Sequence, residues 1–243
     1  MASAPPEILL QDVTFAPGGV TVLDALSLRC AARRVGVIGR NGSGKTSLAR
    51  VMAGLVPADA GRVRVAGVDV ARDRKAALGT VGILFQNPDH QIIFPTVEEE
   101  LAFGLRQMGQ SKEDAAAGVA AVLAQFGKAH WPKAPIVELS QGQRQLVCLM
   151  AVLAMGPRVI ILDEPFAGLD IPVAMQLERV LAGLDQTLVL ITHDPDRLAG
   201  YDQVIWIDEG RVAQHGAAPE VVPAFTARMQ ALGRGDDLSD LAT

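Results

Sequence analysis

The stretch GRNGSGKT, residues 39–46, decides the fold of this chain. It matches the pattern G-x-x-x-x-G-K-[ST], follows the apolar run RVGVIG and opens the helix-forming run TSLARVMAG. Glycines at these positions let backbone N–H groups converge on phosphate oxygens, and the helix N-terminus adds a favourable dipole. The strand–loop–helix setting argues against an incidental glycine turn and predicts a phosphate-binding loop (P-loop).

Each position of this loop is expected to contribute to nucleotide binding. Lys45 is expected to reach the β- and γ-phosphates, and Thr46 is expected to hold Mg²⁺. The predicted nucleotide-binding residues of the loop are Gly39, Arg40, Asn41, Gly42, Ser43, Gly44, Lys45, Thr46 and Ser47.

A second motif, VIILDEP at residues 159–165, supplies carboxylates. Asp163 stands at the end of a predicted buried strand, where a carboxylate can hold Mg²⁺ in a P-loop protein. Glu164, one residue further on, can polarise an attacking water molecule. The two motifs together indicate a P-loop nucleotide hydrolase or kinase.

Composition excludes several other classes of protein. The chain has 243 residues, of which 49% are hydrophobic, and 22 Lys and Arg stand against 27 Asp and Glu. This acidic balance argues against a protein that mainly coats nucleic acid. Cys30 and Cys148 lie in apolar sequence without paired spacing, so we expect reduced core thiols of a cytosolic protein.

No targeting or membrane segment is expected. The first twelve residues lack the charged start and apolar run of a signal peptide. The longest apolar window, LVCLMAVLAMG at 146–156, is shorter than the roughly 18 residues that span a bilayer. We therefore expect that the chain does not cross a membrane by itself.

Apolar strands alternate with helices over most of the chain. Continuous apolar strands of this kind predict a parallel sheet covered on both faces. The expected strands are 7–15, 20–30, 34–39, 62–66, 81–85, 158–163, 187–194 and 203–210, and the expected helices include 46–54, 111–127 and 172–184.

The motif LSQGQRQ at 139–145 narrows the class. It resembles the LSGGQ signature that defines the ABC ATPases, and other features of that family follow in order. Gln86 matches the Q-loop glutamine, Asp170 ends the AGLD of the D-loop, and His193 matches the switch histidine. The resemblance covers residues 7–215.

This resemblance implies an α/β fold with three parts. They are a RecA-like parallel-sheet core, an N-terminal antiparallel β subdomain and an inserted helical subdomain at about 87–155. The expected nucleotide-binding domain spans 4–225, and a short polar tail spans 226–243.

The resemblance also implies a mechanism. Two such domains dimerise head to tail and sandwich ATP between one P-loop and the signature of the other subunit. The expected catalytic residues are Lys45, Glu164 and His193, and the expected Mg²⁺ ligands are Thr46, Gln86 and Asp163. The remaining nucleotide contacts are expected from Gln86, Ser140, Gly142, Gln143 and Asp170.

Two positions depart from the family pattern. Gln141 replaces the first glycine of LSGGQ, so its side chain either adds a polar contact or demands a different loop. Pro17 falls where an aromatic residue usually stacks on adenine. Phe15 would share a face with Pro17 in a regular strand, so no adenine platform is assigned.

The stretch LFQNPDHQIIFPTVEEELAFG at 84–104 indicates the type of ABC ATPase. It resembles the segment that reads QNPDxQ…TVEEDVAFG in energy-coupling-factor (ECF) ATPases, which energise uptake of vitamins such as biotin and of cobalt or nickel. The implied partners are a transmembrane coupling subunit, a second ATPase subunit and, indirectly, a substrate-binding membrane subunit. The implied location is peripheral, on the cytoplasmic face of the membrane.

The residues within this stretch indicate the start of a helix and, before it, a defined surface that could bind a partner. Thr96 and Glu99 fit a capping box, and Glu98 to Glu100 suit a first helical turn, so no catalytic role is assigned to these glutamates. Asp89, His90 and Gln91 have no such local explanation. We therefore predict that residues 87–94 dock the membrane subunit.

Three matters stay open at this level. The sequence does not identify the cargo or distinguish a homodimer from a related heterodimer. A conventional ABC importer or exporter subunit is one alternative. A soluble ABC ATPase acting on nucleic acid is another, which the acidic balance disfavours.

Overall fold

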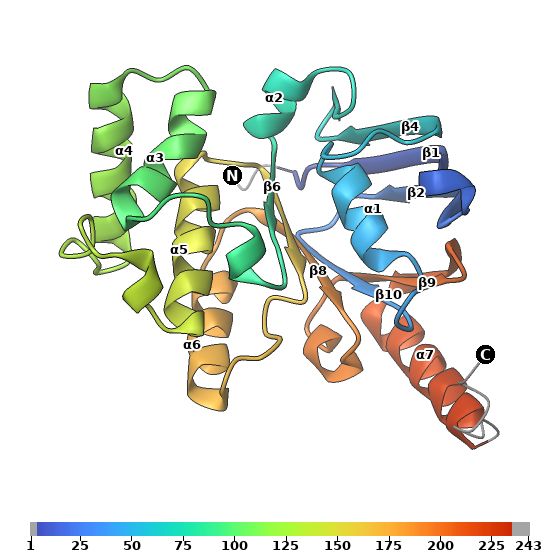
Figure 1. Ribbon diagram of the computed structural model, residues 1–243. Coiled ribbons are helices and arrows are strands. Elements are labelled where there is room, and N and C mark those ends of the chain that lie inside the picture. Colours follow the sequence, from blue (N-terminus) through green and yellow to red (C-terminus); the bar gives the residue numbers. More distant parts are fainter. Residues whose placement is uncertain (1–3, 235–243) are drawn as a thin grey trace.

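A computed structural model describes residues 4–234 and contains two β-sheets with helices around them (Figure 1). The larger sheet has the strand order β10-β9-β3-β8-β7-β6. Five of its strands run parallel and β10 pairs antiparallel with β9 at one edge. The bounds are β3 Arg34–Ile38, β6 Val81–Leu84, β7 Val159–Asp163, β8 Thr187–Thr192, β9 Gln203–Asp208 and β10 Arg211–Ala217.

The smaller sheet is antiparallel and has the order β2-β1-β4-β5. Its strands come almost entirely from the first third of the chain, as the family resemblance implies. The bounds are β1 Ile8–Phe15, β2 Leu23–Cys30, β4 Ala60–Val65 and β5 Val68–Asp69.

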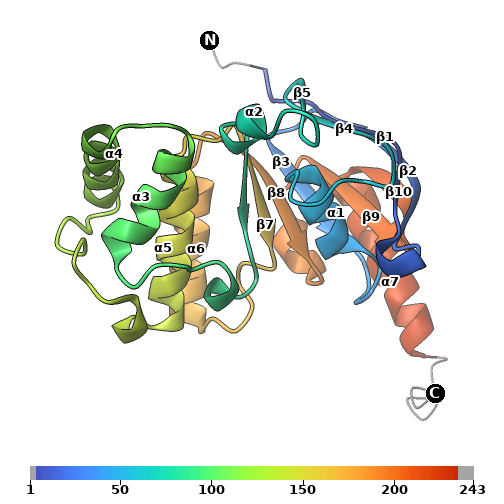
Figure 2. The same ribbon diagram turned by 45° about the horizontal axis from the view of Figure 1, so that its top comes forward.

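Helices cover the larger sheet on both faces and extend to one side of it (Figures 1 and 2). The N-terminal helix α1 follows β3, whereas α3, α4 and α5 form a group beside β6 and β7. The bounds are α1 Lys45–Met52, α2 Arg74–Leu78, α3 Val97–Gln107, α4 Lys112–Gln125, α5 Gln141–Ala154, α6 Ile171–Ala182 and α7 Ala218–Gly233. Short 3₁₀ helices are η1 Pro17–Gly19, η2 Pro88–His90, η3 Ile136–Glu138 and η4 Pro195–Leu198.

Three apolar clusters hold these layers together. The first lies between the smaller sheet, α1 and one face of the larger sheet. The second packs α5, α6 and α7 on the opposite face, and the third packs α3, α4 and α5 together. Helix α5 supplies Cys148 and Leu149 to the second cluster and Val147 and Met150 to the third, so it joins the helical group to the sheet.

The predicted α/β fold is confirmed, with a parallel core, an antiparallel sheet and a helical insertion. The strand β10 and the helix α7 were not predicted from sequence. Helix α7 runs through residue 226, where the polar tail was expected to begin, and residues 235–243 lie outside the described residues. Among residues 4–234, no helix is both long and apolar enough to cross a bilayer.

The predicted capping box at Thr96 is wrong. Thr96 is the N-cap of α3, but its hydroxyl makes no bond to a backbone N–H of the first turn and donates to the Glu99 carboxylate instead. Both cysteines are buried and unpaired in the described part of the chain, as expected of core thiols. Burial raises the pKa of Cys30 to about 11 and that of Cys148 to about 12.

Gly82 provides a test of how α5 packs on the sheet. A Cβ atom at Gly82 of β6 would lie 2.3 Å from Cγ1 of Val152 on α5 and 3.2 Å from Cγ of Pro157. We expect Gly82→Ala to destabilise the protein by about 1–3 kcal/mol, because neither stiff neighbour can yield cheaply. Chemical denaturation with urea measures the change.

Gly79→Ala is the matched control, because a Cβ there would meet Cε of Met108 at 3.5 Å and the carbonyl oxygen of Ala76 at 4.0 Å, both ordinary van der Waals distances. Equal stability of the two variants would contradict the packing argument.

Candidate nucleotide-binding site

The predicted P-loop connects β3 to α1. Gly42 and Gly44 have φ values of +79° and +101°, in the left-handed region that glycine adopts without a steric penalty. A Cβ at Gly39 would lie 2.3 Å from the carbonyl oxygen of Ile207 on β9. The loop therefore needs glycine both for its backbone turn and for close contact with the neighbouring strand.

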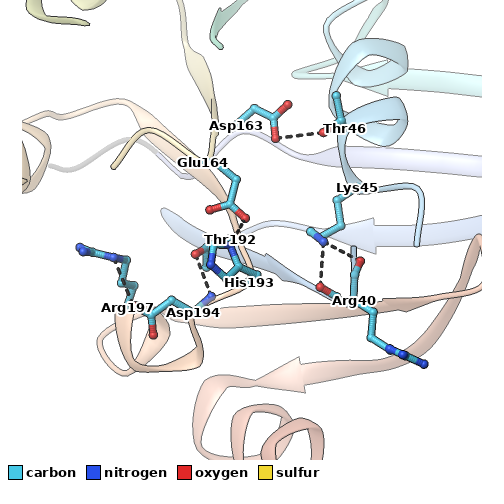
Figure 3. A network of polar contacts seen from close by, with 10 residues as sticks. Arg40, Lys45, Thr46, Asp163, Glu164, Thr192, His193, Asp194 and Arg197 are labelled. Carbon is cyan, nitrogen blue, oxygen red and sulfur yellow. Dashed lines mark hydrogen bonds and ion pairs between the residues drawn. The ribbon is translucent and has the colours of Figure 1, made fainter. Parts of the chain in front are cut away.

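Lys45 lies within the loop, close to its backbone (Figure 3). Its buried ammonium group donates to the carbonyl oxygens of Gly39 at 2.7 Å and Arg40 at 2.8 Å. Burial lowers the pKa of Lys45, and the charges of Glu164 and Asp163 partly oppose that shift. Because an ammonium has three N–H donors, one remains for a phosphate oxygen.

Thr46 and Asp163 lie next to each other on the side of Lys45 that faces away from Arg40 (Figure 3). Oγ1 of Thr46 lies 3.4 Å from Oδ1 of Asp163, which is buried at the end of β7. Burial is the largest effect on the pKa of Asp163 and raises it, although the bond from Thr46 opposes the shift. A hydroxyl and a carboxylate oxygen at this spacing are hard oxygen ligands of the kind that Mg²⁺ prefers.

Glu164 and His193 form the next layer of the site. Nδ1 of His193 lies 2.7 Å from Oε1 of Glu164, which leaves the second carboxylate oxygen and Nε2 free to face a ligand. Glu164 has a φ of +48°, a strained value for a residue with a side chain. Its backbone N–H is fixed by the carbonyl of Ile191 at 3.0 Å.

These groups line one cavity of about 370 Å³. It brings together nine of the predicted P-loop, metal and catalytic positions and Gln86, which follows β6, and adds Val22, which sequence reasoning missed. The lining residues are Val22, Asn41, Gly42, Gly44, Lys45, Thr46, Ser47, Gln86, Asp163, Glu164 and His193. Gly39, Arg40 and Ser43 are not among the lining residues, and the carbonyl oxygens of the first two accept from Lys45.

The Ser43 hydroxyl indicates whether the P-loop suits a bound phosphate group. Its side chain is buried, and its hydroxyl has no hydrogen-bond partner among the described residues. A buried unpaired hydroxyl is costly unless a ligand satisfies it. The orphaned hydroxyl, the spare donor of Lys45 and the glycine backbone all fit a bound phosphate group.

The predicted signature residues lie elsewhere. Ser140, Gly142 and Gln143 line a separate cavity of about 270 Å³, which shares no lining residue with the P-loop cavity. Ser140 is the N-cap of α5 and forms a capping box with Gln143. The Ser140 hydroxyl accepts the Gln143 N–H at 3.3 Å, so its own hydrogen stays available to a phosphate.

The two signature positions next to Ser140 have structural partners. A Cβ at Gly142 would lie 2.4 Å from Cγ1 of Val173, so packing of α5 against α6 also requires glycine there. Nε2 of Gln141 lies 3.4 Å from the carbonyl oxygen of Ala167 and packs against Gly168. The Gln141 side chain therefore makes a polar contact, one of the two alternatives for this position, and it joins the signature loop to the D-loop.

Asp170 does not reach the P-loop cavity within its own chain. Its carboxylate accepts the N–H of Val173 at 3.0 Å and caps α6. At the other end of the site, Phe15 packs against the first apolar cluster and Pro17 is exposed. Pro17 has no aromatic ring and Phe15 is partly buried, so no adenine platform is assigned.

The expected docking segment has more internal contacts than the sequence suggested. Asp89 pairs with Arg144 of α5 at 3.0 Å, and Oε1 of Gln91 accepts the N–H of Phe85 at 3.1 Å. The buried Glu100 carboxylate accepts the N–H groups of Ile93 and Phe94, both at 2.9 Å. Asp89 and Gln91, which had no local explanation in the sequence, therefore both have structural partners, and that of Asp89 lies on a helix distant in sequence.

Comparison with known proteins decides the family. The family description "ABC transporter" matches residues 23–167. The chain belongs to the ABC transporter family. It has the ABC ATPase fold and is an ATP-hydrolysing subunit.

Individual relatives agree with this assignment. The chain is 54% identical to the biotin transport ATP-binding protein BioM of Rhodobacter capsulatus over 91% of this chain and 95% of the relative. It is 38% identical to the nickel import ATP-binding protein NikO of the same species, over 89% of this chain and 91% of NikO. A solved structure of cbiO1 from Clostridium perfringens, described as part of the ABC transporter complex cbiONQ, superposes with a TM-score of 0.75 at 28% identity, covering 94% and 95% of the two chains.

The spare donor of Lys45 leads to a binding prediction. Lys45→Ala is expected to weaken MgATP binding about 10- to 100-fold, because a charged hydrogen bond in a buried site is lost. Binding of a fluorescent ATP analogue measures the effect. Lys75→Ala, at an exposed position of α2, is the control and is expected to bind normally. Equal affinity of the two variants would contradict the role of Lys45.

Proposed function

We propose that this chain energises an importer of the ECF type, with biotin as the favoured cargo. It would act on the cytoplasmic face of the membrane as a peripheral subunit, with a transmembrane coupling protein and a second ATPase subunit. The similarity to BioM over nearly the whole of both chains supports biotin over the nickel cargo named for NikO.

The separation of the two cavities carries the proposal of a dimer. One chain contains a P-loop cavity and, apart from it, a helix N-terminus with the free hydroxyl hydrogen of Ser140. A second copy turned head to tail would bring the N-terminal dipole of α5 toward the γ-phosphate of the first copy. Two composite sites would form in this way, each built by both subunits.

Apolar exposure near the signature supports the same arrangement. Val137 lies two residues before the signature loop and is 85% exposed, and Ile171 follows Asp170 and is 76% exposed. Met175, one turn further along α6, is also exposed. A second subunit placed on this face would remove these side chains from water, which favours association.

Within each composite site, the residues of the P-loop cavity would divide the chemistry. Lys45 would bind the phosphates with its remaining N–H. The free carboxylate oxygen of Glu164 would accept a proton from the attacking water, while its other oxygen stays bonded to His193. Nε2 of His193 would face the γ-phosphate, and the Glu164 contact would fix the orientation of the ring.

Thr46, Asp163 and Gln86 would hold Mg²⁺, which would neutralise charge on the β- and γ-phosphates. Both Thr46 and Asp163 contribute oxygen atoms already held close to each other. The N-terminus of α1 completes the site electrostatically.

A groove of about 480 Å³ offers the membrane subunit a place to bind. It lies between the P-loop core and the helical group, and the exposed side chains of Leu55, Leu78 and Ile93 take part in its lining. Residues 87–94 contribute only Gln91 and Ile93, so most of the groove comes from α2, α3 and α5 and from the segment after α1. An apolar helix end of the coupling subunit would fit these side chains.

Blocking hydrolysis tests the dimer. Glu164→Gln is expected to bind MgATP but to hydrolyse it about 100-fold more slowly or worse, because the amide cannot accept a proton. A dimer that persists with MgATP is then expected in size-exclusion chromatography with light scattering. The variant with Lys45→Ala added should remain monomeric. Hydrolysis at the normal rate would count against Glu164 as the base.

Ile93→Glu tests the groove. Its side chain is 67% exposed, so folding and nucleotide binding should be preserved. Purification from native membranes is expected to recover this variant without the transmembrane subunit, and cellular uptake of labelled biotin should be lost.

Ala121→Glu on the exposed face of α4 is the control and is expected to retain both properties. Retention of the membrane subunit by Ile93→Glu would disprove docking at the groove, and uptake of nickel in place of biotin would reassign the cargo.

A further inference from the structure

The segment that carries Gln86 is attached on both sides to one helical turn. On its N-terminal side, the Gln145 amide donates to the carbonyl oxygen of Phe85 at 3.3 Å. On its C-terminal side, Oδ1 of Asp89 lies 3.0 Å from Nε of Arg144, an ion pair in which the buried Nε–H makes no hydrogen bond within the described residues. Arg144 and Gln145 are neighbours in the first turn of α5, and η2 lies beside this helix (Figures 1 and 2).

Both attachments continue to other parts of the hydrolytic site. Nη1 of Arg144 donates to the carbonyl oxygen of Leu139, the first signature residue, at 2.6 Å. Nε2 of Gln145 also lies 3.4 Å from the carbonyl oxygen of Pro165, directly after Glu164. The first turn of α5 therefore contacts the backbone beside Gln86, beside Glu164 and within the signature loop.

The contacts that Gln145 and Arg144 make depend on how far each side chain is buried. Gln145 is only 2% exposed and the Arg144 side chain is 23% exposed, whereas the Asp89 side chain is 60% exposed. The Arg144 guanidinium is partly desolvated, so losing the Asp89 carboxylate leaves its charge compensated, among the described residues, only by the Leu139 carbonyl, while the exposed Asp89 side chain returns to water. The single guanidinium of Arg144 spans from the docking segment to the signature, with no intervening residue.

We propose that the Asp89–Arg144 pair is a positioning device that holds the signature loop and the Gln86 segment as one unit. This inference rests on the proposed function. It specifies how a displacement of the docking segment is transmitted to the ATP site that the signature loop completes in the other subunit. When the membrane subunit displaces residues 87–94, the ion pair of Asp89 with Arg144 and the hydrogen bond of Arg144 to Leu139 transmit the displacement to the signature loop. Ser140 then moves relative to the γ-phosphate bound by the second copy.

Amide hydrogen exchange of the purified full chain tests this connection without a membrane partner or hydrolysis. Asp89→Asn is expected to speed exchange of residues 139–143 several-fold, although these lie about fifty residues away in sequence. Arg144→Gln should do the same for residues 85–90. Elsewhere exchange should stay as in the unsubstituted chain, which separates local release from general destabilisation.

Glu7→Gln is the matched control, because it removes the exposed ion pair with Arg29 on the smaller sheet by the same change of acid to amide. It should leave residues 139–143 unaffected. Unchanged exchange of 139–143 in Asp89→Asn would overturn the proposal, and so would an equal rise throughout the chain.

Steady-state kinetics provides a second readout. Asp89→Asn and Arg144→Gln are each expected to lower kcat for MgATP about three- to tenfold while the nucleotide affinity of the P-loop stays unchanged. The double variant should be no slower than Arg144→Gln alone, because both changes break one contact. Arg144→Lys, which keeps the charge, should recover part of the rate.

Additive losses in the double variant would overturn the coupling between these residues. Loss of nucleotide affinity equal to the loss of kcat would also overturn it, because a positioning role leaves the P-loop intact. Failure of the Ile93→Glu test would refute docking at the groove but would leave these measurements valid, so the two proposals can fail separately.

Discussion

The parallel pairing of β3, β8, β7 and β6 is the constraint on which the rest of this structure depends. Parallel strands end at the same edge of a sheet, and ligands bind beyond their carboxyl ends. The P-loop follows β3, His193 follows β8, Asp163 ends β7 and Gln86 follows β6. Hydrogen bonds between strands therefore bring four distant segments to one cavity of about 370 Å³.

Helix α5 is equally important, because it positions the signature loop. Its apolar side chains belong to two clusters, so it cannot shift without disturbing either the sheet or the helical group. Its N-terminus carries the signature serine, and its first turn contacts the backbone on both sides of the catalytic centre. A helix placed in this way can couple the P-loop cavity to the signature loop by moving as a rigid body.

Polar contacts in this region serve folding and function together. Glu100 is buried because it accepts two backbone N–H groups that the irregular segment before α3 would otherwise leave unpaired. Gly142 is required by packing against Val173 as well as by any phosphate that approaches it. Gln141 occupies a position where the family usually has glycine, and the glycine at 168 opposite it leaves room for its side chain.

The sequence by itself determined the class of the protein, because backbone turns and metal-ligand chemistry restrict which residues can occupy the P-loop and the strand-end carboxylates. GRNGSGKT, VIILDEP and LSQGQRQ predicted the fold and the main ligand. Local patterns also located most strands to within a few residues. They did not reveal the edge strand β10, whose polar residues lack clean alternation, or the failed capping box at Thr96, where a nearby carboxylate competes for the hydroxyl.

Only the tertiary structure decided which of these residues share a cavity. It placed Ser140, Gly142 and Gln143 apart from the P-loop, and it paired Asp89 with Arg144 across more than fifty residues of sequence. It also built the apolar groove from α2, α3, α5, β6 and the segment after α1, with only Gln91 and Ile93 from the predicted docking segment 87–94. Contacts between residues distant in sequence depend on how whole elements pack, and no local pattern of residue types encodes that packing.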